Sequence, residues 1–253
     1  RTLQRIVALK LIRKGDSASA ADLARFKSEA LVASRISHPN VVQVLDAGTV
    51  DDQPYYVMPF LDGETLAQRL ARGPLRQDEA AGIVSILAKA VESSHKSGLL
   101  HRDLKPSNII FDRSGVPHVS DFGLAKVFGP ESADSIPRQN PATASGAILG
   151  TPGYMAPEQI SKAYGETGPA SDVYALGAIL YEMLAGRPPF RAATVMETLL
   201  LVLDQEPVRP ALLVPKINPD LELICLKCLQ KRPDMRYASA EDLARDLDSW
   251  REH

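Results

Sequence analysis

The hydrophobic pattern of the chain changes near residue 63. Before that point, three short runs rich in apolar and β-branched residues predict strands, over 6–12, 41–48 and 54–60. A helical period of apolar residues lies between the first two runs. It begins at a capping pair, Ser19 and Asp22, and ends at the HPN sequence of 38–40. The first part of the chain is therefore predicted to be a small, strand-rich unit that carries one helix.

Beyond residue 63 the apolar residues recur mainly with helical spacing. This period predicts three long helices, over 77–97, over 171–190 and after the capping pair Ser239 and Asp242. The second is the most apolar long stretch of the chain, so we expect it to be buried. Residues 126–149 break the pattern, because Pro, Ser, Ala and Gly dominate there. A loop of this length within a compact domain usually has a function.

Composition narrows the classes of function. The 253 residues include 29 Lys and Arg against 31 Asp and Glu, a near balance that argues against nucleic acid as the main partner. No apolar run approaches the length that a transmembrane helix needs. Cys225 and Cys228 lack a second pair and fall in a helical pattern, so we interpret them as buried apolar residues rather than a redox or zinc site. The chain opens at Arg1 inside a strand pattern, so we expect a longer protein, with any membrane anchor outside these residues.

One polar stretch, HRDLKPSN at 101–108, concentrates the candidate chemistry. Asp103 can accept a proton, and Lys105 can lie beside a developing negative charge. Asn108 offers a neutral oxygen that suits a hard divalent cation, and Asp121 in the sequence DFG offers a second oxygen. The apolar run IIF follows the stretch at once and predicts a short strand, which would hold the polar loop against a rigid element.

The order HRDLKPSN, short strand, DFG and then APE at 156–158 resembles the protein kinases. The alternative, an ordinary polar loop with an accidental DFG, would not explain the three motifs together. The chain is most similar to the eukaryotic-like (Hanks-type) bacterial Ser/Thr kinases in its sequences YVMPFLDGETL, GTPGYMAPEQI and CLQKRPDMRYASAEDL. The resemblance implies an α+β, bilobal protein-kinase fold, with a strand-rich N-lobe over 1–62 that ends in the hinge and a helical C-lobe over 63–253.

The chain departs from the family pattern at its start, where the glycine-rich loop that covers the nucleotide phosphates is missing. The glycines ahead of residue 60 are Gly15 and Gly48, and both are isolated. Because backbone N–H groups of such a loop bind phosphate, we expect residues 1–253 to bind ATP·Mg²⁺ roughly tenfold more weakly, or worse, than a chain extended upstream. Adenosine, which has no phosphate, should lose less affinity.

The resemblance implies transfer of the γ-phosphoryl group of ATP to Ser or Thr hydroxyls of protein substrates, with Mg²⁺ or Mn²⁺. In that reaction Asp103 accepts the hydroxyl proton and Lys105 stabilises the transferring group. Thr151 forms hydrogen bonds with both Asp103 and Lys105. Asn108 and Asp121 hold the metal. Two alternatives stay open: a pseudokinase or scaffold, which the intact site residues disfavour, and a small-molecule phosphotransferase, which would lack the segment from DFG to APE.

The nucleotide site is likewise implied by the resemblance. Lys10 would position the α- and β-phosphates and pair with Glu29. Around the adenine the family places a small residue of the lysine strand, the gatekeeper, two hinge residues and one residue of the strand after the catalytic loop; these are Ala8, Met58, Pro59, Leu61 and Ile110.

Regulatory and structural roles follow from the same resemblance. A basic pocket of Arg102 and Lys126 would bind a phosphate on Thr143 or Ser145 in the activation segment. Structural roles fall to five residues: His101, Phe122, Asp172, and Glu158 with its expected partner Arg236. Asp172 is expected to bond the backbone of the HRD loop. We also expect a cytoplasmic catalytic domain without nucleic-acid or membrane contact, and a homodimer that autophosphorylates in trans.

Overall fold

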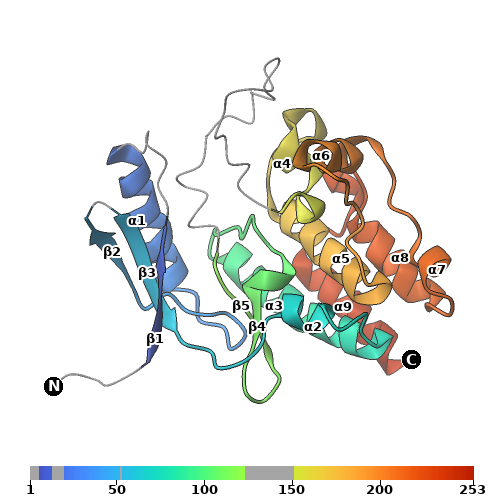
Figure 1. Ribbon diagram of the computed structural model, residues 1–253, viewed down its shortest axis with the longest axis horizontal. Coiled ribbons are helices and arrows are strands. Elements are labelled where there is room, and N and C mark those ends of the chain that lie inside the picture. The colour runs from blue at the N-terminus through green and yellow to red at the C-terminus, as the bar shows by residue number, and fades with distance from the viewer. Residues whose placement is uncertain (1–5, 13–19, 52, 123–150) are drawn as a thin grey trace.

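The computed structural model describes residues 6–12, 20–51, 53–122 and 151–253, and it arranges them in two lobes (Figure 1). The smaller lobe is a three-stranded sheet with one helix, and the larger lobe is almost entirely helical. The chain passes into the larger lobe after the third strand of the smaller lobe. The α+β, bilobal fold predicted from the sequence is therefore confirmed.

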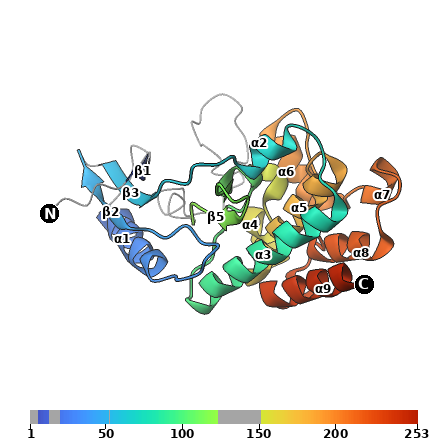
Figure 2. The same ribbon diagram turned by 90° about the horizontal axis from the view of Figure 1, so that it is seen from below.

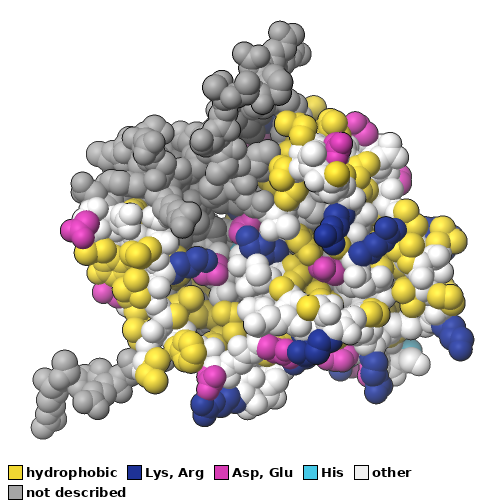
Figure 3. All heavy atoms as spheres, in the orientation of Figure 1, with side chains coloured by type: hydrophobic (Ala, Val, Ile, Leu, Met, Phe, Trp, Pro, Cys, Tyr) yellow, Lys and Arg dark blue, Asp and Glu magenta, His cyan; other side chains and the backbone are white. Residues whose placement is uncertain are grey.

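The sheet of the small lobe is antiparallel, and its strand order is β1-β3-β2. Its elements are β1 (Val7–Leu11), α1 (Ala20–Ser34), β2 (Asp46–Val50) and β3 (Gln53–Pro59). Helix α1 lies along the sheet (Figure 2) and buries Phe26, Ala30 and Ala33 in the core. The outer face of β1 exposes Val7 and Leu9, and hydrophobic side chains gather over this lobe in Figure 3.

The strand predicted over 41–48 begins later than expected, at Asp46. Val41, Val42 and Val44, which suggested a longer strand, are buried in the segment that precedes it. The N–H of Val42 donates to the carbonyl of Val119 in the large lobe, at 2.8 Å. This apolar run therefore packs the two lobes together instead of extending β2.

The large lobe is built on long helices with two short strands between them. Its elements are α2 (Leu66–Leu70), α3 (Gln77–Lys96), β4 (Ile109–Phe111), β5 (Pro117–Val119), α4 (Pro157–Ile160), α5 (Pro169–Ala185), α6 (Val195–Asp204), α7 (Pro210–Leu213), α8 (Pro219–Cys228) and α9 (Ala240–Glu252). None of the helices in the described ranges is both long enough and apolar enough to cross a bilayer.

Helix α5 forms the centre of the large lobe, as its apolar sequence predicted. Every residue from Ser171 to Tyr181 is buried. Gly177 permits the close approach of α8, because a Cβ there would lie 2.3 Å from the Cβ of Cys228. Cys225 and Cys228 are buried free thiols in this contact, so their interpretation as apolar core residues is confirmed. The helix ends at Gly186, whose φ of 73° suits a residue without a side chain.

Candidate active site

The catalytic-loop residues converge on the carboxylate of Asp103. Lys105 Nζ lies 2.8 Å from Asp103 Oδ2, and the amide nitrogen of Asn108 donates to the Asp103 carbonyl at 2.9 Å and to Oδ2 at 3.3 Å. A short 3₁₀ turn, Pro106–Asn108, leads directly into β4 and so fixes the spacing of the loop. The side chains of Asp103 and Lys105 are each 22% exposed, which leaves the carboxylate open to a substrate hydroxyl.

His101 anchors the loop in the core. Its Nε2 bonds the Ser120 carbonyl at 2.9 Å, and its ring lies 4.8 Å from that of Phe122, between centroids. Burial lowers the pKa of His101, so the ring is neutral near neutral pH. The contact joins the catalytic loop to the DFG sequence, in agreement with the structural roles expected for His101 and Phe122.

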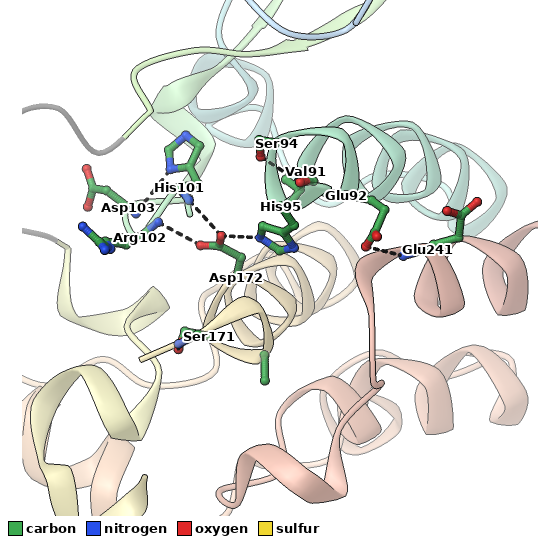
Figure 4. Close-up of polar contacts among 12 residues, drawn as sticks. Val91, Glu92, Ser94, His95, His101, Arg102, Asp103, Ser171, Asp172 and Glu241 are labelled. Atoms are coloured by element: carbon green, nitrogen blue, oxygen red, sulfur yellow. Dashed lines mark hydrogen bonds and ion pairs between the residues drawn. The ribbon is translucent and has the colours of Figure 1, made fainter. Parts of the chain in front are cut away.

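Asp172 of α5 holds the backbone of the loop, as expected. Its carboxylate accepts hydrogen bonds from the N–H groups of His101 and Arg102, each at 2.8 Å (Figure 4). Burial alone would raise the pKa of Asp172, but the hydrogen bonds from the His95 side chain and the His101 N–H outweigh it, and the pKa lies below its ordinary value. The ionised carboxylate can thus stabilise Arg102 at a φ of 63°, a left-handed conformation that costs about 1–2 kcal/mol in a residue with a side chain.

His95 is a residue of this network that the sequence analysis missed. It stands in the last turn of α3 and donates from Nε2 to Asp172 Oδ2 at 2.8 Å (Figure 4). Its side chain is 5% exposed. The only sequence signal is a histidine six residues before His101, and nothing local connects it to Asp172, which is far away along the chain.

Asn108 and Asp121 fit a divalent metal of the Mg²⁺ type. The amide nitrogen of Asn108 faces Asp103, so its oxygen is the atom left for a cation. The hydroxyl of Ser120, the residue before Asp121, donates to the Asn108 carbonyl at 3.0 Å, which ties the two ligand segments together. The described residues contain no cluster of three His, Cys, Asp or Glu side chains suited to a metal. A pair of oxygen ligands matches Mg²⁺, which is commonly bound by one or two protein oxygens with substrate phosphates and water.

Lys10 has a partner other than the one expected. Its Nζ lies 2.8 Å from Asp121 Oδ2, whereas Glu29 lies 3.6 Å from Arg102. The hydroxyl of Tyr56 donates to the other oxygen of Asp121. The predicted pair of Lys10 and Glu29 is absent from the ion pairs of the described residues, because Asp121 and Arg102 supply closer opposite charges.

The residues expected around adenine lie on β1, on β3 and its continuation, and on β4. Ala8 lies opposite Met58, and Val7 opposite Pro59, in the register of β1 and β3. Beyond the strand, an isolated bridge joins Thr65 to Ile110. Ala8, Met58, Pro59, Leu61 and Ile110 are all half-buried. Strand register thus places Ala8 beside Met58, and the adenine site that the resemblance implies for the five residues stays a prediction.

The residues expected to act in the activation segment are only partly described. Lys126, Thr143 and Ser145 lie outside the described residues. Arg102 is 42% exposed. Thr151 is exposed at the start of the turn Pro152–Tyr154, and no hydrogen bond among the described residues joins it to Asp103 or Lys105. The structure differs here from the prediction: Lys105 and Asp103 bond each other without Thr151.

Glu158 and Arg236, expected as a pair, meet in two hydrogen bonds. The guanidinium nitrogens lie 2.7 and 2.8 Å from the two carboxylate oxygens, and both side chains are fully buried. Ser171 donates to the same carboxylate at 2.7 Å, and the Ala170 carbonyl accepts from Arg236 at 2.8 Å. The pair therefore fastens the end of the activation segment to α5 and to the turn before α9.

Comparison with known proteins places these features in a family. The family model for the protein kinase domain matches residues 1–247. A probable serine/threonine-protein kinase of Streptomyces coelicolor is 36% identical over 98% of this chain and 36% of its own length. The serine/threonine-protein kinase PknB of Mycolicibacterium smegmatis is 36% identical over 97% of this chain and 39% of its own length. A crystal structure of the PknI kinase domain of Mycobacterium tuberculosis matches with a TM-score of 0.72 and 26% identity, over 96% of this chain and 85% of that one. The chain thus spans somewhat less than two fifths of the length of these two curated relatives.

Proposed function

Because this chain belongs to the protein kinase family, we propose that it transfers the γ-phosphoryl group of ATP to Ser or Thr hydroxyls of proteins. The observation that supports the proposal most directly is the cluster of Asp103, Lys105 and Asn108, with its link through Ser120 to Asp121. Curated relatives of the same domain carry the name serine/threonine-protein kinase. ATP and Mg²⁺ or Mn²⁺ are the cofactors that this reaction uses.

The proposed mechanism assigns each step to a side chain of the loop. Asp103 orients the substrate hydroxyl and accepts its proton, since its carboxylate is partly exposed and held by Asn108. Lys105, 2.8 Å from that carboxylate, lies where it can stabilise negative charge on the transferring group. Lys10 is the cation available for the α- and β-phosphates. Asn108 and Asp121 would hold the metal, which neutralises phosphate charge when bound.

Specificity for Ser and Thr is the first prediction of this proposal. The family resemblance of the loop sequence DLKPSN supports it, since tyrosine kinases typically carry alanine and arginine in this neighbourhood. Phosphoamino-acid analysis of a protein substrate, or of the autophosphorylated protein, should detect phosphoserine and phosphothreonine. Phosphotyrosine as the main product would overturn the assignment.

Regulation by phosphorylation of the activation segment is the second prediction. Arg102 pairs with Glu29 at 3.6 Å, so a phosphate on Thr143 or Ser145 would compete with that carboxylate for Arg102, with Lys126 as a further cation. The double change Thr143→Ala with Ser145→Ala is expected to lower activity several-fold, whereas Ser114→Ala, an exposed control on another loop, should not. Unchanged activity of the double variant would contradict the proposal.

The proposal extends to the setting of the domain. Protein substrates are its partners, and a homodimer would allow one copy to phosphorylate the activation segment of the other. A cytoplasmic location is supported by the use of ATP and by the two buried free thiols of α8. Mass spectrometry of a mixture of active protein and an inactive Asp103→Asn copy would detect phosphorylation in trans.

A further inference from the structure

Tyr56 bonds Asp121, the expected metal ligand, although nothing in the sequence pattern places it there. It lies on β3 directly opposite Lys10 of β1. Paired residues of antiparallel strands point to the same face, so the phenol and the ammonium stand side by side. Both reach the carboxylate of Asp121: the hydroxyl donates to Oδ1, and Lys10 Nζ lies 2.8 Å from Oδ2.

The two partners of Asp121 differ in their freedom to leave it. Tyr56 is 3% exposed, and its buried hydroxyl has this carboxylate as its bonding partner. Lys10 is 42% exposed and carries a flexible, charged side chain that a phosphate can attract. Nucleotide binding would therefore remove Lys10 from Asp121 and leave Tyr56 in place.

The phenol also suits a carboxylate that must keep its charge for a cation. A phenol hydroxyl is uncharged at neutral pH and offers one O–H donor. The hydroxyl therefore remains a neutral donor. A neutral donor orients the carboxylate without cancelling its charge, which a lysine or arginine at the same position would do.

We propose that Tyr56 is a positioning residue for the metal ligand Asp121: its hydroxyl holds Oδ1, so that Oδ2 remains for the divalent cation once Lys10 moves to the nucleotide. This role rests on the proposed function, because that function makes Asp121 a metal ligand. It differs from a packing role, since phenylalanine would fill almost the same volume and lose only the hydrogen bond.

The test measures binding rather than turnover. Calorimetry with ATP plus Mg²⁺, and with ATP plus a chelator, is performed on the parent protein and on Tyr56→Phe. The variant should bind ATP·Mg²⁺ about fivefold or more weakly, because a hydrogen bond to a charged group is lost, and should bind metal-free ATP within about twofold of the parent. Tyr55→Phe is the matched control on the same strand. Its hydroxyl lies on the opposite face of the strand, next to Gly48: a Cβ added to Gly48 would be 2.7 Å from it.

The outcomes separate the two claims. Equal losses for both ligands in Tyr56→Phe would mean that the residue only supports the fold, and an unchanged ATP·Mg²⁺ affinity would mean that its hydroxyl does not position Asp121; either result overturns the role of Tyr56 alone. A parent protein that binds ATP no more tightly with Mg²⁺ than without it would contradict the proposed function, and the role of Tyr56 with it.

Discussion

The change Asp103→Asn is expected to lower kcat by about 10²–10⁴-fold and to leave thermal stability close to that of the parent. The side chain keeps its shape but loses the group that accepts the hydroxyl proton. Asparagine can keep hydrogen bonds at this position, and the side chains of Asp103 and Lys105 are partly exposed, so the fold depends little on the charge. Steady-state kinetics and a thermal melt of the same preparation measure the two effects.

A matched carboxylate controls for the loss of charge alone. Asp234 pairs with Arg232 on the exposed surface, and both side chains are more than half exposed. Asp234→Asn should therefore leave kcat unchanged. If Asp103→Asn retains turnover within a few-fold of the parent, Asp103 cannot be the proton acceptor.

The change Arg236→Leu is expected to destabilise the protein by about 3–5 kcal/mol, because it leaves a buried carboxylate without its partner. Glu158 and Arg236 both have fully buried side chains, and the guanidinium also bonds the carbonyls of Ala170 and Lys231. All of these acceptors would lose a donor together. Urea unfolding, followed by far-UV circular dichroism, gives the change in free energy from the shift in midpoint.

Arg232→Leu is the control for this measurement. That arginine is four residues away in the same turn and pairs with Asp234 on the surface, where solvent screens the interaction. It should shift the midpoint little. Equal shifts for the two variants would show that the buried pair contributes no more than a surface pair.

Much of this fold could be predicted because its signals are local. The helical period of 77–97 predicted α3 closely. The apolar run of 171–190 predicted α5, but the helix ends at Ala185, because Gly186 takes a left-handed conformation there. The catalytic loop could be predicted equally well from the sequence, since Asp103, Lys105 and Asn108 lie within six residues. The distances between them follow from one turn and one strand.

The contacts between distant segments could not be predicted in this way. Val41 and Val42 had the pattern of a strand, but their burial depends on β5, which is reached only after the chain has crossed between lobes. The partner of Lys10 depends on the charges that surround it in three dimensions. Tyr56 and His95 acquire their roles from Asp121 and Asp172, which are 65 and 77 residues away along the chain.

Transfer of labelled phosphate is the measurement that tests the proposed reaction most directly. The full-length protein is incubated with Mg²⁺ and ATP labelled at either the γ- or the α-phosphate, together with a protein acceptor. The proposal predicts label on Ser and Thr from γ-labelled ATP with the parent, almost none with Asp103→Asn, and none from α-labelled ATP. Transfer from α-labelled ATP, equal transfer by the variant, or no transfer by the parent would contradict phosphoryl transfer at this site.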